Sequence, residues 1–467
     1  MISELLAVMG ESRDPEELKY YWVEYRKATG RKYRHIFSKA IEEENKWAKN
    51  KGYENKGKYN LASYEDENFL HNAAKEIEKI LPFYKQLHAY VRTKLIQFYP
   101  NVTIKPDGPI PAHLFGDMYG QEWDAIFPIV EPYPNRTGLF DVTDVMKEKK
   151  MKAIDMFIMA EDFFTSMGLM KMKPHFWRYS QFQKPKHRNM SCLASAFDFY
   201  DGKDYRIQMC AEVDADSLET IYHEMGHIEY YMHYAHLPQL FRESANPGFH
   251  EAIGDTISLS ISNPEYLRSR GLSKEREVMD EKDNINYLMY IALRYAVTIN
   301  YAYIIDHWRI QVYNGSLKSD HFNEKYWHYR KKYQGLCPPV KRTEKDFDIG
   351  AKHHIAFNVE YFRYFVANIL QFQIYKTLCN EANYEGLLHK CNIYGNKNAG
   401  KALGRLLREG KSKPWQEILS IFSNNMYNKL DSSAMLEYFE PLKQWLKKKN
   451  KGEFIGWKSK DSMSCPR

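Results

Sequence analysis

The stretch from His223 to Asp255 constrains this sequence more than any other. It opens with His-Glu-Met-Gly-His at 223–227 and ends with a Gly-Phe-His-Glu-Ala-Ile-Gly-Asp run at 248–255. Histidines four residues apart lie on one face of a helix, so one cation can bind both imidazoles while Glu224 faces the same cavity. The pattern therefore predicts a helical zinc site of the kind that hydrolases use.

The helix that carries the two histidines has a recognisable start and a packing face. Asp216 followed by Glu219 is a capping pattern, and an apolar stripe recurs at helical spacing through Ile221, Met225, Ile228 and Met232. His223 lies about two 100° steps round the helix from Ile221. We therefore expect the stripe to pack the helix while the histidines face a cleft.

A second helix is expected to begin near Phe249, after the breaker Asn246-Pro247-Gly248. Glu251 and Asp255 lie one turn apart on it. A catalytic zinc needs three protein ligands and an open fourth position, and Glu251 can complete a His2Glu set. Asp255 is suited to accept the free N–H of a ligand histidine. Without these carboxylates, His223 and His227 would read as two hydrogen-bonded helix histidines.

Composition allows a large core and argues against two classes of partner. The chain has 467 residues, 44% of them hydrophobic, and a net charge of +7 that is spread out except for a Lys-rich end at 447–460. That end is typical of a solvated tail rather than a nucleic-acid arm. No apolar run approaches the roughly 18 residues of a membrane span, and no charged-then-apolar leader precedes the first helical segment.

The six cysteines fit either redox compartment by count. Cys192 and Cys210 flank an expected hairpin with Asp201-Gly202 as its turn, and Cys379 and Cys391 enclose a short loop. Each pair is plausible as a local disulfide, although spacing alone also allows reduced thiols, and Cys337 and Cys465 have no obvious mates. Four glycosylation sequons give weak support for secretion: Asn101, Asn135, Asn189 and Asn314.

Most of the remaining sequence is helical in pattern. Charged and aromatic residues alternate up to about residue 100, and apolar helical spacing returns in several later segments: 142–167, 282–315, 361–377 and the last ninety residues. Residues 190–213 alternate and branch like a short β-element. An exposed strand edge beside a metal site can bind an extended peptide through main-chain hydrogen bonds.

Several ordered motifs resemble the angiotensin-converting enzyme family of peptidyl-dipeptidases. The resemblance rests first on residues 222–231 and 245–255, and it extends nearly end to end through 108–113, 194–196, 332–339 and 363–365. It implies a mainly α, two-lobed metallopeptidase with a deep central cleft and a small β-element near residues 190–213. It also implies an extracellular, secreted protein with disulfides Cys192–Cys210 and Cys379–Cys391.

The resemblance implies one catalytic domain over residues 1–467. The family's helices that lid the cleft normally lie upstream of the point where this chain begins. We therefore expect a domain without those helices. Two explanations stay open: the sequence is a fragment of a longer protein, or the gene starts at Met1.

The resemblance also assigns roles to single residues. His223, His227 and Glu251 would bind zinc, and Glu224 would move the proton of the attacking water. His354 and Tyr364 would meet the negative charge that develops on the peptide oxygen, and His353 should point elsewhere because adjacent histidines diverge. The C-terminal carboxylate of an oligopeptide substrate would be held by Gln121, Lys352 and Tyr361.

The resemblance implies that four positions influence substrate choice. The related carboxypeptidase branch has Arg at the position of Gln121, so Gln121 favours release of dipeptides. Ala194 and Ala196 match the positions that bind the peptide main chain. Between them and Cys192, Leu193 replaces the family's usual substrate-binding His. Losing that hydrogen bond should cost about 0.5 to 1.5 kcal/mol of binding, so we expect weaker binding or altered specificity with the metal site intact.

Two chloride sites are implied as well, the first at Arg26, Tyr326 and Arg330 and the second at Tyr64 and Arg363. Taken without the family, these residues would read as ordinary ion pairs or aromatic contacts.

Three other functions compete with a zinc peptidyl-dipeptidase. A zinc-binding but weakly active homologue could bind peptides or partners, and Leu193 favours it while Glu224 opposes it. A structural helical protein would bind no stoichiometric metal. A peptidase that cuts internally would tolerate an amidated substrate.

Overall fold

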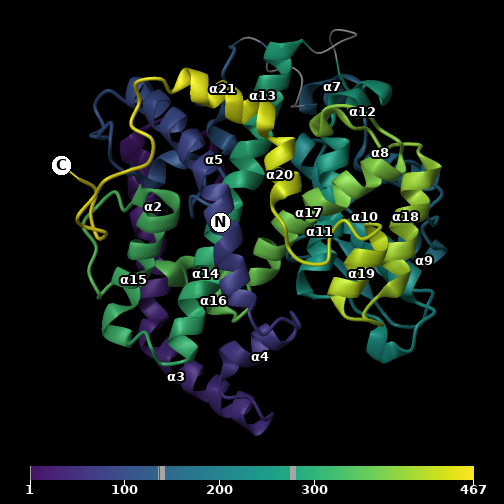
Figure 1. Cartoon of the computed structure of the whole chain (residues 1–467), viewed down its shortest axis with the longest axis horizontal. Coiled ribbons are helices and arrows are strands. Elements are labelled where there is room, and N and C mark those ends of the chain that lie inside the picture. Colours follow the sequence, from purple (N-terminus) through teal and green to yellow (C-terminus); the bar gives the residue numbers. More distant parts are fainter. Residues whose placement is uncertain (1, 135, 137–141, 274–279, 467) are drawn as a thin grey trace. The chain divides into compact units, whose positions relative to one another are not determined.

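The computed structural model describes residues 2–134, 136, 142–273 and 280–466, and over these it is mainly helical, as predicted (Figure 1). The chain divides into two compact units. Unit 1 comprises Met1–Pro134, Asn284–Phe365 and Phe439–Arg467, and unit 2 comprises Asn135–Asp283 and Val366–Tyr438. The predicted cleft and single-domain organisation stay predictions.

Unit 1 is built from long helices with buried stripes. In α5 (Phe69–Phe98), Ile77, Ile80, Tyr84 and Leu87 are buried at helical spacing, as the charged-and-apolar pattern predicted. The other α-helices of this unit are α1 (Ile2–Glu11), α2 (Pro15–Ala28), α3 (Gly30–Asn50), α4 (Lys56–Ala62), α6 (Phe127–Val130), α13 (Glu281–Ile291, which starts in unit 2), α14 (Val297–Tyr313), α15 (Phe322–Tyr329), α16 (His353–Ala356) and α21 (Glu440–Lys449).

Unit 2 is also built from helices with buried stripes. The predicted spacing near the C-terminus is confirmed in α18 (Lys397–Glu409), where Leu403, Leu406 and Leu407 are buried and the Asn396 side chain caps the first turn. The remaining α-helices are α7 (Thr143–Glu148), α8 (Ala153–Ser166), α9 (Pro174–Tyr179), α10 (Ala215–Tyr234), α11 (Pro247–Ile261), α12 (Pro264–Ser269), α17 (Phe362–Glu381, which starts in unit 1), α19 (Trp415–Phe422) and α20 (Ser433–Tyr438).

Two small sheets occur in the described ranges. The predicted β-element is an antiparallel hairpin of β2 (Ser195–Asp198) and β3 (Tyr205–Gln208), with Ala196 opposite Ile207 and Asp201-Gly202 in its turn. Gln181 bridges to Gln208 on β3, which leaves the other edge of β2 without a strand neighbour in the described part of the chain. A second, unpredicted sheet pairs β1 (Ile110–Pro111) with β4 (Leu336–Cys337) in parallel.

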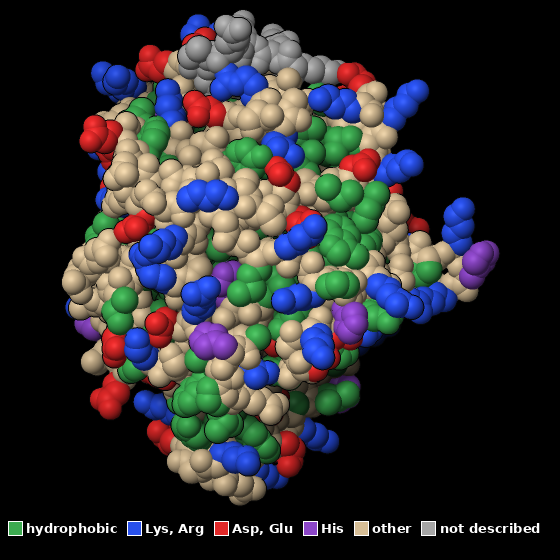
Figure 2. All heavy atoms as spheres, turned by 90° about the vertical axis from the view of Figure 1, so that its right-hand side faces the viewer, with side chains coloured by type: hydrophobic (Ala, Val, Ile, Leu, Met, Phe, Trp, Pro, Cys, Tyr) green, Lys and Arg blue, Asp and Glu red, His purple; other side chains and the backbone are tan. Residues whose placement is uncertain are grey.

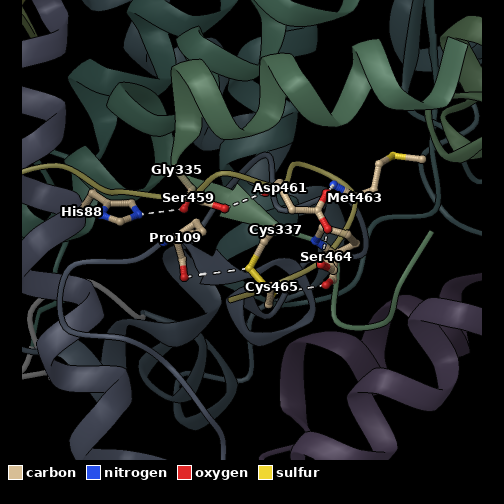
Figure 3. The surroundings of a disulfide bond; sticks show 10 residues. His88, Pro109, Gly335, Cys337, Ser459, Asp461, Met463, Ser464 and Cys465 are labelled. Carbon is tan, nitrogen blue, oxygen red and sulfur yellow. Dashed lines mark hydrogen bonds between the residues drawn. A yellow bond between two sulfur atoms is a disulfide. The ribbon is translucent and has the colours of Figure 1, made fainter. Parts of the chain in front are cut away.

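All six cysteines are paired. The structure contains the two expected disulfides, Cys192–Cys210 and Cys379–Cys391. The third, Cys337–Cys465, joins β4 to the C-terminal segment and pairs the two cysteines for which the sequence showed no obvious mates (Figure 3). The segment is also held by a hydrogen bond from the Arg342 N–H to the Met463 carbonyl at 2.9 Å. A separation of 128 residues explains why spacing did not reveal the pair.

One helical stretch, Glu281–Tyr313, is long and apolar enough to cross a membrane. Within its most apolar window, 83% of the residues are buried inside the protein, which is the pattern of a core helix.

Basic and acidic side chains are interspersed on the face drawn in Figure 2, with apolar side chains between them. Three of the predicted glycosylation sequons have exposed asparagines: Asn101, Asn189 and Asn314. Asn135 lies outside the described residues.

Candidate active site

The helix α10 carries the histidine motif and starts two residues earlier than a cap at Asp216 would require. Its N-cap is Asp214, whose carboxylate accepts the Ser217 N–H at 2.7 Å, so the predicted Asp216 cap is wrong. Asp216 instead lies in the first turn, where its negative charge interacts favourably with the positive end of the helix dipole. The predicted stripe, including Ile221 and Met225, is fully buried.

The second helix, α11, packs closely against α10 because two glycines face each other. Its N-cap Asn246 accepts the Gly248 N–H at 2.9 Å, which places the helix start close to the prediction. A Cβ on Gly226 would lie 3.4 Å from Gly254 Cα, and a Cβ on Gly254 would lie 2.6 Å from the His223 ring. The absence of a side chain at Gly254 therefore leaves the space that the His223 imidazole occupies against α11.

His223 lies between two carboxylates of α11. Its Nε2 is 3.4 Å from Glu251 Oε2, and its Nδ1 is 3.2 Å from Asp255 Oδ1. His223, Glu224 and His227 each offer a ligand atom within 4.8 Å of the other two. His227 Nδ1 lies 3.3 Å from His250 Nδ1. The Nε2 atom of His227 takes no part in that contact.

The distance between His223 and Glu251 fits two ligands of one tetrahedral zinc ion. Zinc bonds of about 2.0 to 2.2 Å place ligand atoms about 3.3 to 3.6 Å apart, which matches the separation of His223 from Glu251. Glu224 also belongs to the compact cluster, but it lies between the histidines on α10. Glu251, 3.4 Å from His223, stays the predicted third ligand, and Glu224 stays the predicted proton carrier.

Burial and mutual charge set the electrostatics of this cluster. Burial lowers the pKa of His223, but hydrogen bonds to Asp255 and Glu251 outweigh it and raise the pKa well above its usual value. Burial and the nearby charge of His223 hold the pKa of His227 well below the usual range. Burial raises the pKa of Glu224 to about 7. A cation would balance the carboxylates that surround these imidazoles.

The hairpin of unit 2 lies next to α10. Tyr231 of α10 donates a hydrogen bond to the Ala196 carbonyl at 3.4 Å, so the β2 main chain is tied to the metal-site helix. Ala194 is half-buried just before β2, while Leu193 is 68% exposed. The predicted peptide-binding positions therefore lie beside α10, and Leu193 projects into solvent.

In unit 1, the three predicted carboxylate-binding residues converge. Lys352 Nζ and the Tyr361 hydroxyl both donate to Gln121 Oε1, the latter at 3.3 Å. Burial lowers the pKa of Lys352 to about 8. Glu122 was not predicted; it accepts from Gln121 Nε2 at 3.2 Å, and burial raises its pKa to about 7.

His354 and Tyr364 also meet in unit 1, with His354 Nε2 3.2 Å from the Tyr364 hydroxyl. Burial lowers the pKa of His354 to about 3, so this imidazole is neutral near pH 7. His353 instead stacks on Phe357 at 4.2 Å between ring centroids. The expectation that the two adjacent histidines diverge is confirmed.

The first predicted anion site is a buried group of cations. Arg330 donates to the Tyr326 hydroxyl at 2.6 Å, Arg26 donates to the Met118 carbonyl at 2.9 Å, and both guanidiniums are buried. In each, Nε is buried without a hydrogen-bond partner among the described residues.

Neighbouring charges leave this group positive. Arg342 binds Asp348 through Nε at 2.9 Å and Asp346 at 3.2 Å. Arg26, Arg330 and Arg342 thus face two carboxylates, which leaves one formal positive charge in a buried place. Such a site suits a small anion.

The second predicted anion site already contains a carboxylate. The Tyr64 hydroxyl donates to Glu360 Oε1 at 2.7 Å, and Arg363 Nε lies 3.4 Å from Glu360 Oε2. Glu360 was not singled out from the sequence.

The chain is similar to several known proteins of one family. The family model described as angiotensin-converting enzyme matches residues 1–457. The chain is 44% identical to angiotensin-converting enzyme of Mesocricetus auratus over 97% of this chain and 34% of that protein. It is 41% identical to angiotensin-converting enzyme of Theromyzon tessulatum over 96% of this chain and 72% of that protein. It is 39% identical to the angiotensin-converting enzyme-like protein Ace3 of Mus musculus over 97% of this chain and 62% of that protein.

The chain thus spans about a third of the length of the Mesocricetus auratus relative and nearly three quarters of the Theromyzon tessulatum one. The resemblance carried by the sequence motifs is confirmed. This chain belongs to the angiotensin-converting enzyme family.

Proposed function

We propose that this chain is a zinc-dependent peptidyl-dipeptidase, which releases C-terminal dipeptides from oligopeptides. The observation that carries the proposal is the position of His223, 3.4 Å from Glu251 on one ring nitrogen and 3.2 Å from Asp255 on the other. Glu224 and His227 belong to the same cluster. Membership of the family supports the same function.

In this proposal His223, His227 and Glu251 hold the zinc. When bound, the ion polarises the scissile carbonyl and lowers the pKa of water towards neutrality. Asp255 accepts the Nδ1–H of His223, which fixes the tautomer and leaves Nε2 for the metal.

Glu224 is the proton carrier. Its carboxylate takes a proton from the attacking water and gives it to the departing amine nitrogen. Burial of this carboxylate raises its pKa above the ordinary value, which favours a group that both takes and gives a proton. The His354 and Tyr364 side chains donate to the oxygen on which negative charge develops, and their 3.2 Å contact orients both groups.

Gln121, Lys352 and Tyr361 bind the free C-terminal carboxylate of the substrate. Lys352 supplies charge, while the Gln121 and Tyr361 side chains supply hydrogen bonds. An anchor two residues beyond the cut sets the register, which explains the release of dipeptides. The main chain at Ala194 and Ala196 binds the extended peptide by strand addition.

We further propose that the protein acts outside the cell and that chloride binds at the Arg26 and Arg330 guanidiniums. Three disulfides favour an oxidising compartment. The excess positive charge at the two arginines favours an anion there.

The decisive experiment is a product assay. The protein is incubated with a short free-acid peptide, with the same peptide amidated at its C-terminus, and with each in the presence of a chelator. Mass spectrometry should detect a dipeptide and a peptide shortened by two residues from the free acid, much less product from the amide, and none with chelator. Equal cleavage of acid and amide would exclude a dipeptide-releasing enzyme. Full activity of the Glu224→Gln variant would exclude Glu224 as the proton carrier.

A further inference from the structure

The second predicted anion site is filled by a side chain of the protein itself. Tyr64 is 1% exposed and donates to one Glu360 oxygen at 2.7 Å, while Arg363 faces the other at 3.4 Å. A hydroxyl donor and a guanidinium are the groups that would bind a chloride ion. Here both bind a carboxylate fixed three residues before Arg363 in the chain.

Charge balance distinguishes this site from the Arg26 group. Arg309 Nε donates to Asp306 Oδ1 at 2.7 Å, directly beside the Glu360–Arg363 pair. The arginines Arg309 and Arg363 therefore face the carboxylates Asp306 and Glu360, and their formal charges cancel. The Arg363 side chain is 34% exposed and that of Glu360 13%, so the site is only half-buried. A further anion would lie beside both carboxylates with no excess positive charge among these four groups, which is unfavourable.

The ionisation of Glu360 depends on opposing effects. Burial and the nearby Asp306 carboxylate raise its pKa to about 7, while Arg363, Tyr64 and Arg309 lower it. Above pH 7 the side chain is therefore mainly the charged form that Tyr64 and Arg363 stabilise. The role of Glu360 should therefore be tested near pH 8, where its side chain is charged.

The same network holds the segment that carries three proposed site residues. Arg309 donates to the His354 carbonyl at 3.1 Å and to the Val359 carbonyl at 2.6 Å. Asp306 accepts the backbone N–H groups of Tyr361 and Phe362. Glu360 lies between these contacts, so its carboxylate fixes the chain that presents His354, Tyr361 and Tyr364.

We propose that Glu360 is a built-in anion, which takes the place of chloride between Tyr64 and Arg363 and positions the segment from His354 to Tyr364. The proposal assigns Glu360 a positioning role and rests on the proposed peptidase function of that segment. Exogenous chloride is then unnecessary at this site.

The test compares Glu360→Ala with Glu360→Gln at pH 8. Truncation to alanine opens space for a small anion, whereas glutamine keeps the shape, fills the space and lacks the charge. Peptide cleavage is measured in a chloride-free gluconate buffer and after addition of sodium formate or sodium chloride at constant ionic strength. We expect both variants to lose about tenfold in kcat relative to the unchanged protein, because the donors on the segment are misplaced. Formate or chloride should restore most of the rate in Glu360→Ala only, beyond any effect on the unchanged protein.

A matched control and a second readout complete the test. Glu344→Ala removes another arginine-paired carboxylate of unit 1, the partner of Arg34 at 3.1 Å, and should respond to anions as the unchanged protein does. The melting temperature should rise with formate more in Glu360→Ala than in Glu360→Gln, because only alanine creates a binding site. Full activity of Glu360→Gln, or identical anion responses in both Glu360 variants, would overturn the proposal. If the unchanged protein cleaves no peptide, the proposed function fails, and the melting temperatures alone decide whether Glu360 occupies an anion site.

Discussion

The Cys337–Cys465 disulfide should stabilise the protein more than either shorter bridge. It closes a loop of 128 residues, whereas Cys379–Cys391 closes one of 12. In the chain-entropy model these loops restrict the unfolded chain by about 5 and about 3 kcal/mol respectively at 25 °C. Replacing both cysteines of the long loop with serine should therefore lower the free energy of unfolding by about 2 kcal/mol more than the same change in the short loop.

Seven of the nine tryptophans lie in unit 1 with the long-loop disulfide, so tryptophan fluorescence reports its unfolding well. Trp457, beside the C-terminal segment, packs on His88 at 4.7 Å between ring centroids and is a local probe. Guanidinium unfolding curves of Cys337→Ser/Cys465→Ser and Cys379→Ser/Cys391→Ser supply the comparison. A smaller loss for the long loop than for the short one would refute the entropic argument. It would mean that contacts such as the Arg342–Met463 hydrogen bond hold the segment without the covalent bond.

Four further predictions concern the proposed site. Glu224→Gln should lower kcat at least a hundredfold while one zinc per chain remains by metal analysis; an unchanged rate would contradict its role. Asp255→Asn should weaken zinc binding by about 10 to 100-fold in competition with a chelator, because the His223 tautomer is no longer fixed; equal affinity would show that this contact is not needed. Since the pKa of Lys352 is lowered by burial to about 8, its charge is present below that pH and lost above it, so KM for free-acid peptides should rise between pH 7 and 9. Lys352→Arg should remove that rise, and a KM independent of pH in the unchanged protein would argue against a charged anchor. Leu193→His should lower KM by an amount equivalent to about 0.5 to 1.5 kcal/mol, and unchanged peptide kinetics would show that the lost histidine is irrelevant.

Local periodicity was enough to predict that His223 lies close to Glu251 and Asp255. His223 and His227 share a helix face, Glu251 and Asp255 share another, and a helix repeat fixes both spacings before any tertiary contact is known. The cap at Asp216 failed because Asp214 also suits that role, and its side chain reaches the Ser217 N–H. Sequence patterns thus locate a helix better than its first residue.

The residues that were missed depend on contacts between distant parts of the chain. Cys465 meets Cys337 across 128 residues, and Glu360 meets Tyr64 across nearly 300. No local repeat marks either pair. Gly254 did leave a signal, because a glycine inside a helix costs about 1 kcal/mol relative to alanine and often marks a close approach. Here that approach is to the His223 ring.

The two predicted anion sites of unit 1 show that residues can match a family's anion ligands without binding the same anion. Tyr64 and Arg363 are suitable ligands for an anion, but the anion that they contact is the Glu360 carboxylate. At Arg26, by contrast, buried positive charge exceeds the nearby carboxylates, which favours the anion from solution that we propose there. Any chloride dependence of this protein at pH 8 should therefore disappear when the Arg26 group is neutralised, even with Tyr64 and Arg363 intact.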